Sequence, residues 1–297
     1  MHYERHGEGP AVLMIPGLGA TAAFFDRAVA DLSRDHTVVT VDLPGHGRTP
    51  RGRGEPTLQS AAVQLRGVIH GLGLDQLTLV GWSLGATLAW TYLERFGADG
   101  VRRLVSVDQS PRLIDEDGWE YAAFGSLDRK GGQDLVASAI QDPAGFLTNL
   151  IHGSFATGSE PAPGLVAELL AHSASCDPAA LRSLLADALA QDWRERVGAL
   201  TLPTLLVHGG RSAVYPPEVG AWLAEAFPVA RLEVIETAGH LCFLEEPERF
   251  ATAIRTFEAS PASQLSHEDR ANHTNHASHA SHPSHPSHPN HTDGSGR

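Results

Sequence analysis

The feature that most constrains the fold is a regular alternation of short apolar, β-branched runs with helical stretches over residues 1–258. The helical stretches, such as 58–72 and 84–96, carry apolar residues at three- and four-residue spacing. The short runs are apolar on both faces, which is typical of parallel strands covered by helices on both sides. We therefore predict an α/β fold with a mostly parallel sheet and the strands Ala11–Ile15, Thr37–Val41, Leu77–Val80, Leu104–Val107, Thr204–Val207 and Leu232–Ile235.

The alternation breaks once, between Val107 and Thr204, where the chain is rich in Leu, Ala, Gly and Pro and shows no clear strand. A loop of this length without structure of its own is improbable in a compact domain. We predict a helical cap at residues 111–197 that lies over the sheet edge. The core would then consist of residues 1–110 and 198–258.

A histidine-rich tail, residues 259–297, follows the predicted core. From His273 to His291 a histidine occupies every third position, separated mainly by Ser, Pro, Asn and Ala. The tail has almost no large apolar residues to bury, so we expect it to be disordered. Its imidazoles favour weak Zn²⁺ or Ni²⁺ binding, and the alternative is a low-complexity expansion without a selected role. We predict no metal site in the core.

The charge balance argues against several classes of protein. With 22 Lys and Arg against 35 Asp and Glu, the net charge is −13. Binding to nucleic acid or to an anionic membrane requires a concentrated basic surface, so we expect neither partner. No apolar run approaches the roughly 20 residues that span a bilayer, and the N-terminus does not resemble a signal peptide. The two cysteines, Cys176 and Cys242, form no disulfide framework, so the expected location is the cytoplasm.

The first candidate for chemistry is the segment Gly81–Gly85, which reads Gly-Trp-Ser-Leu-Gly. It directly follows a predicted strand and opens the helical stretch 84–96, which is the context of a nucleophile elbow. The elbow presents the hydroxyl of Ser83 at a helix N-terminus, where N–H groups favour a developing anion. The alternative is that Ser83 only caps the helix between two packing glycines.

A serine needs a general base to act as a nucleophile. His240 follows Gly239 in the loop after the last predicted strand. A histidine at the carboxyl end of a strand in an open α/β sheet can be aimed at Ser83. The alternative is a purely structural histidine.

These residues together resemble the α/β-hydrolase fold superfamily over residues 1–258. The matching segments are Ile15–Gly19, Asp42–Thr49, Gly81–Gly85, Gly239–His240 and Glu245–Pro247. The resemblance implies that Ser83 is the nucleophile and His240 the base. It also implies that the backbone N–H groups of Leu18 and Leu84 form the oxyanion hole, and that His46 is structural.

The triad acid departs from the pattern of this superfamily. Its usual place follows the penultimate strand, where this chain has Ser212. Serine cannot stabilise an imidazolium as a carboxylate does. Asp108, at the end of the strand after the elbow helix, occupies the place that proteins resembling haloalkane dehalogenases and cofactor-free dioxygenases of this fold use for their acid. We predict the triad Ser83, Asp108 and His240; the alternative is that Asp108 only opens a turn before Pro111.

The predicted site is mostly apolar, as ligand pockets usually are. We expect Trp82, Phe24, Leu241 and Phe146 to line it. There is no basic cluster for a phosphate or a polycarboxylate, and Lys130 is the only lysine. The expected substrate is a small, mainly apolar carboxylic ester, thioester or lactone, and no cofactor is expected.

The leading functional hypothesis is a serine hydrolase that works through an acyl-enzyme. Two alternatives remain open. A cofactor-free dioxygenase would use the pair of His240 and Asp108 as a base on a heteroaromatic substrate. A non-catalytic ligand-binding protein would have kept the fold, with Ser212 as a sign of a lost triad.

Overall fold

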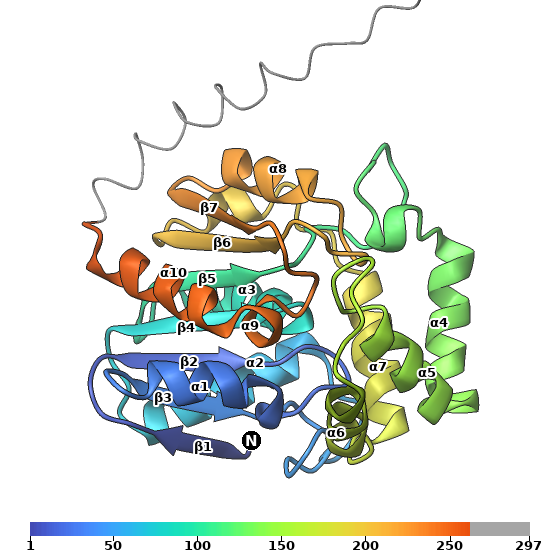
Figure 1. Ribbon diagram of the computed structural model, residues 1–297, viewed down its shortest axis with the longest axis horizontal. Helices are drawn as coiled ribbons and strands as arrows, with labels where there is room; N and C mark the ends of the chain where they lie inside the picture. Colours follow the sequence, from blue (N-terminus) through green and yellow to red (C-terminus); the bar gives the residue numbers. More distant parts are fainter. Residues whose placement is uncertain (262–297) are drawn as a thin grey trace, which may run out of the picture.

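Seven strands form one sheet in the order β1-β3-β2-β4-β5-β6-β7, and a computed structural model describes residues 1–261 of the chain (Figure 1). The strands are β1 (Tyr3–His6), β2 (Ala11–Ile15), β3 (Thr37–Val41), β4 (Leu77–Trp82), β5 (Val101–Val107), β6 (Thr204–Gly209) and β7 (Ala230–Ile235). All neighbouring pairs are parallel except β1 with β3. The predicted α/β class and mostly parallel sheet are confirmed.

The six predicted strands are present, and four of them extend beyond the predicted apolar runs. β1 was not predicted. Its residues, Tyr-Glu-Arg-His, are half-buried or exposed at the sheet edge, where one side of the strand has no partner strand. An edge strand of this kind is blunted by charge and lacks the apolar pattern that reveals a buried strand.

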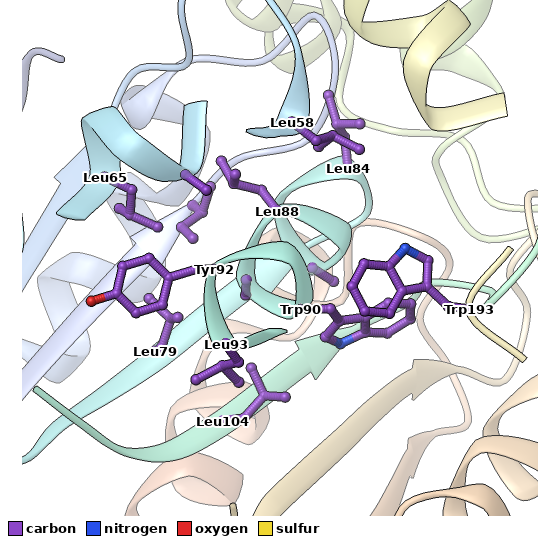
Figure 2. Close-up of a cluster of buried hydrophobic side chains, with 14 of the residues drawn as sticks. Leu58, Leu65, Leu79, Leu84, Leu88, Trp90, Tyr92, Leu93, Leu104 and Trp193 are labelled. Carbon is purple, nitrogen blue, oxygen red and sulfur yellow. The ribbon is translucent and has the colours of Figure 1, made fainter. Parts of the chain in front are cut away.

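Helices cover both faces of the sheet. On one face lie η1 (Ala22–Phe25), α1 (Asp26–Leu32), α9 (Cys242–Glu245) and α10 (Pro247–Ala259); on the other lie α2 (Leu58–Gly71), α3 (Leu84–Phe96) and α8 (Glu218–Ala226) (Figure 1). Figure 2 shows part of the second face, where Trp90 of α3 packs edge-on against Trp193 and Leu93 of α3 lies near Leu104 of β5. Burial of these large side chains is the main source of stability for the elbow helix and its strand.

The insert between β5 and β6 consists of helices joined by irregular segments, and a β-bridge pairs Arg112 with Asp192. It contains η2 (Ala123–Gly125), α4 (Arg129–Gln141), α5 (Pro143–His152), α6 (Pro163–Ser173) and α7 (Pro178–Leu189), and η3 (Val197–Ala199) leads back to the sheet. The two ends of the insert lie side by side, and the N–H of Trp193 donates a hydrogen bond of 2.8 Å to the carbonyl of Pro111. The helices α4 to α7 stand together beside the sheet in Figure 1. The cap boundaries at residues 111 and 197 stay a prediction.

The strand order reverses direction at β2. From β2 the chain moves to β3 on one side and then to β4 on the other. Such a switch point leaves a crevice at the carboxyl ends of the strands, where ligands bind in open α/β sheets. The loop after β2 and the elbow after β4 both lie at this crevice.

α10 ends at Ala259, the first residue of the predicted tail. The rest of the tail from residue 262 lies outside the described residues, and so does its predicted weak metal site. Within residues 1–261, no helix is long and apolar enough to cross a membrane.

Candidate active site

Ser83 occupies a strained turn between β4 and α3. Its φ of 54° and ψ of −124° lie in a region that residues with a side chain rarely adopt. Strain of this kind persists where the surrounding structure enforces it, and it clusters at active sites. The predicted strand–turn–helix context of Ser83 is therefore present in the structure.

The glycines of the elbow allow close packing around Ser83. A Cβ atom on Gly81 would come within 2.3 Å of the carbonyl oxygen of Gly85. A Cβ atom on Gly85 would come within 2.2 Å of the carbonyl oxygen of Ile15 in β2. Only glycine fits at either position, so the motif is required by the backbone geometry that presents the hydroxyl.

His240 and Asp108 form a buried pair. Nδ1 of His240 lies 2.6 Å from Oδ2 of Asp108, and the two side chains are 4% and 0% exposed. Asp108 also has a left-handed backbone, with a φ of 42°. Because Nδ1 is engaged by the carboxylate, Nε2 is the nitrogen of His240 that is available as a base. The structure thus brings Asp108 and His240 together from β5 and from the loop after β7.

The carboxylate of Asp108 has partners on both oxygens. The hydroxyl of Ser212 donates to Oδ2 at 2.8 Å, and the backbone N–H of Gly209 donates to Oδ1 at 3.1 Å. Nδ1 of His208 lies 3.4 Å from Oδ1. Burial alone would raise the pKa of Asp108, but the interactions with His208 and His240 outweigh it and hold the pKa well below its usual range. Asp108 is therefore ionised at neutral pH.

Ser212 also fixes its own loop. Its hydroxyl oxygen accepts the backbone N–H groups of Val214 and Tyr215, both at 3.3 Å. The residue in the usual acid position thus connects the carboxylate of Asp108 to the loop after β6. Sequence reasoning treated Ser212 only as a lost acid and missed this contact.

The loop that carries His240 is held by Glu245 of α9. Its carboxylate accepts the backbone N–H of Gly239 at 2.8 Å and that of Ala156, from the insert, at 2.8 Å. Burial raises the pKa of Glu245, and these two N–H groups partly offset the rise. The indole N–H of Trp82 donates to the carbonyl of His240 at 2.8 Å. Glu245 and Trp82 therefore both fix the backbone of the loop that carries His240.

The two residues whose N–H groups are predicted to form the oxyanion hole, Leu18 and Leu84, lie close to Ser83. Leu84 is the first residue of α3, and the first N–H groups of a helix have no partner within it. Leu18 follows β2 and lines the same cavity as Leu84. The neighbouring N–H of Gly19 donates to Nε2 of His46 at 3.1 Å, and burial lowers the pKa of His46 to about 4. His46 is thus a neutral, buried acceptor that holds the loop carrying Leu18.

A narrow apolar cavity opens above Ser83. Its volume is about 80 Å³. Ser83 and His240 line it together with Leu18, Leu84 and side chains from the insert; among these are Leu113, Phe124, Leu135, Leu150 and Leu185. Ser83, His240, Leu18 and Leu84 therefore share one cavity between the sheet and the insert.

The predicted lining residues lie elsewhere. Trp82, Phe24 and Leu241 are buried in the core cluster on the face of α1 and α10, where Phe24 stacks on Trp82 at 6.1 Å between ring centroids. The side chain of Trp82 points to this face because it alternates with its neighbours along β4. Phe146 lines a second cavity next to the first. None of these four residues lines the cavity over Ser83, and their role in substrate binding stays a prediction.

Tyr215 is a site residue that sequence reasoning missed. It lines the cavity, its ring stands edge-on to His240 at 5.6 Å between centroids, and its hydroxyl interacts with Ser83. Burial and the charge of Asp108 raise the pKa of Tyr215 well above its usual range, so its hydroxyl keeps its proton. The sequence signal that could have indicated Tyr215 is its position just after Ser212, in the loop that follows β6.

Residues 1–261 contain no group of three His, Cys, Asp or Glu side chains arranged to hold a metal ion. Cys176 and Cys242 are buried free thiols. Burial raises the pKa of Cys176 to about 12 and that of Cys242 well above its usual range. Neither thiol is therefore poised as a nucleophile.

Comparisons with known proteins bear on the family to which this fold belongs. A model of the alpha/beta hydrolase fold family matches residues 10–247. The chain is 32% identical over 251 residues to the pimeloyl-[acyl-carrier protein] methyl ester esterase of Chromobacterium violaceum, covering 84% of this chain and 95% of that protein. The enzyme of the same name from Nitrosospira multiformis is 28% identical over 86% of this chain and 97% of its own.

Among solved structures, an esterase from Exiguobacterium antarcticum superposes with a TM-score of 0.80 at 25% identity and covers 87% of this chain and 95% of its own. A bromoperoxidase from Bacillus anthracis has a TM-score of 0.81 at 23% identity, covering 87% and 95%, and supports the fold alone. The chain therefore belongs to the α/β-hydrolase fold family, and within it to the carboxylic ester hydrolases.

Proposed function

We propose that this enzyme hydrolyses small, mainly apolar carboxylic esters through an acyl-enzyme, with Ser83, His240 and Asp108 as its catalytic triad. The observation that carries the proposal is the buried 2.6 Å contact between His240 and an ionised Asp108, beside a strained serine in the same apolar cavity. Thioesters and lactones are attacked by the same chemistry and fall within the proposed substrate class.

In the first step, Oγ of Ser83 attacks the ester carbonyl while Nε2 of His240 takes the hydroxyl proton. The carbonyl oxygen becomes an oxyanion that the N–H groups of Leu18 and Leu84 stabilise. Collapse of the tetrahedral intermediate breaks the bond to the alkoxy group, which leaves as an alcohol with the proton from His240. Throughout, Asp108 orients the ring and stabilises the imidazolium.

In the second step, water enters the site and His240 takes one of its protons. The resulting hydroxide attacks the acyl-enzyme carbonyl, and Ser83 leaves with the proton returned by His240. The carboxylic acid is released and the enzyme is regenerated. Tyr215, a protonated donor that interacts with Ser83, helps to hold the serine hydroxyl in the cavity.

The cavity favours an uncharged acyl group. Its lining residues are mostly aliphatic, and none of them is Lys, Arg, Asp or Glu. The curated relatives carry the name of methyl ester esterases acting on a pimeloyl-[acyl-carrier protein], so a methyl ester of an aliphatic acyl chain is a natural first substrate to test.

The test is the substitution Ser83→Ala, assayed on short p-nitrophenyl esters and with a fluorophosphonate probe. We expect turnover and labelling both to disappear while the melting temperature stays close to that of the wild type. Equal labelling of the wild type and the variant would remove Ser83 as the nucleophile. Oxygen uptake with a quinolone-type substrate that survives in Ser83→Ala would support a cofactor-free dioxygenase in its place.

A further inference from the structure

The cavity over Ser83 is too small for a long acyl chain. Its volume is about 80 Å³. For comparison, an engineered protein cavity of about 150 Å³ binds a single benzene molecule. A substrate with more than a few carbon atoms in its acyl group must therefore extend beyond this inner cavity.

A second cavity adjoins the inner one between α4 and α5. Its volume is about 310 Å³. Phe124, Leu135 and Leu150 line both cavities and so form the partition between them. Phe146 adds a further apolar wall to this outer cavity, and Ser138, Asp142, Gly145 and Asn149 complete it.

Phe124 is the part of the partition that is best able to move. Leu135 and Leu150 project from α4 and α5, whereas Phe124 lies in the short η2 turn and is 48% exposed. Its φ of 55° and ψ of 26° are left-handed, and its N–H is held by the carbonyl of Val214 at 2.8 Å. Strained residues of this kind cluster at ligand clamps and switch regions.

We propose that the outer cavity is the acyl-tail subsite of this enzyme and that the side chain of Phe124 separates it from the nucleophile. The proposal rests on the proposed function, because it assumes that the acyl carbonyl is bound at Ser83. Turning Phe124 away joins the two cavities. The substrate class is then esters of linear acyl chains whose carbonyl lies in the inner cavity and whose tail lies in the outer one.

The outer cavity also sets a condition on the far end of the chain. The carboxylate of Asp142 lines it, and none of its lining residues is Lys, Arg or His. Asp142 is fixed there because Oδ1 accepts the N–H of Gly145 at 3.0 Å as the cap of α5. An acyl chain that ends in a free carboxylate would meet this charge, whereas an ester, amide or methyl end would not.

The first experiment measures kcat/KM for p-nitrophenyl acetate, butyrate, hexanoate and octanoate. We expect the ratio of octanoate to acetate to rise about two- to tenfold in Phe124→Ala, which corresponds to the energy of turning a side chain off its rotamer. Phe124→Gly relieves the left-handed backbone and should give the same shift if Ala disturbs the turn. Asn149→Trp, at an exposed position of the outer cavity, should lower the ratio by about fourfold for each methylene it excludes.

The matched control is Ile140→Ala, which removes a 44% exposed side chain from α4 that lines neither cavity. Its ratio should equal that of the wild type. Ratios within twofold of the wild type in Phe124→Ala, Phe124→Gly and Asn149→Trp would overturn the proposal. Fluorophosphonate labelling of Ser83 and hydrolysis of the acetate ester report on the proposed function separately, because neither needs the outer cavity.

The second experiment compares the dimethyl and monomethyl esters of suberic acid. We expect a higher kcat/KM for the diester than for the monoester. In Asp142→Asn the ratio of the two kcat/KM values should fall about two- to fivefold, which is the size of effect expected for an exposed charge pair. Asparagine keeps the helix cap and removes only the charge. Equal rates for the two esters in the wild-type enzyme would refute the placement of the acyl tail beside Asp142.

Discussion

The charge of Asp108 is the property on which we expect catalysis to depend most. In Asp108→Asn the new side chain has the same size, and its carbonyl oxygen can still accept the N–H of Gly209. Its amide group, however, would donate to Nδ1 of His240, which now lies 2.6 Å from a carboxylate oxygen. The proton of the neutral imidazole then moves to Nε2, and the ring cannot accept a proton from Ser83.

The magnitude follows from this change of tautomer. In a serine protease triad, replacing the acid by its amide lowers kcat by about 10⁴, equivalent to about 5 kcal/mol of transition-state stabilisation. Asp108 is completely buried and ionised, so water cannot replace its charge. We expect kcat for p-nitrophenyl butyrate to fall by about 10³ to 10⁴.

The assay compares initial rates near pH 8 with melting temperatures measured on the same samples. Asp115→Asn, at an exposed carboxylate, is the matched control and should keep full activity. Adding Ser212→Asp to Asp108→Asn should restore part of the rate, because the Ser212 hydroxyl lies 2.8 Å from the oxygen that His240 contacts. A loss of less than tenfold in a folded Asp108→Asn would refute the reasoning and leave Asp108 as a turn residue.

Two further predictions concern the loops that hold the site. Glu245→Gln replaces a charged acceptor of two N–H groups, and we expect the free energy of unfolding, measured in urea, to fall by about 1.5 to 3 kcal/mol. We also expect a lower kcat, because the loop that carries His240 is released. An unchanged stability would contradict this role of Glu245. His46 is expected to make the protein less stable as the pH falls from 6.5 to 4, because its pKa is lowered from 6.5 to about 4 and the unfolded chain takes up the proton first. The expected loss in the free energy of unfolding is about 3 kcal/mol. The stability advantage of the wild type over His46→Gln should therefore shrink over this pH range, and a constant advantage would argue against a lowered pKa of His46.

The fold could be predicted from the sequence because buried parallel strands carry a simple signal. β2, β3, β4 and β6 are buried along nearly their whole length, and their residues are almost entirely apolar or β-branched. β1 was not predicted because this charged edge strand depends on pairing with β3. Such pairing is a tertiary contact and leaves no local pattern in the sequence.

The geometry of the site was predictable where it depends on backbone constraints, whereas the side chains that line the cavity were not. Gly81 and Gly85 are fixed by close approaches of the backbone, so the elbow around Ser83 leaves a motif. Which aromatic side chains face the cavity depends instead on strand pleat and loop path. Trp82 is adjacent to Ser83 in sequence and yet packs into the core, whereas Tyr215 reaches Ser83 from a distant loop.

The position that we propose for the triad acid follows from the geometry of the sheet. β5 and β6 are neighbouring parallel strands, so the residues just beyond their carboxyl ends lie side by side. A carboxylate at either end can reach Nδ1 of His240, and only one charge is needed there. With the carboxylate on Asp108, a second one at position 212 would repel it; a hydroxyl donates to it instead. Ser212 is therefore the hydrogen-bonding partner that suits a carboxylate at the end of β5. Moving the carboxylate from position 108 to position 212 should require substitutions at both positions together.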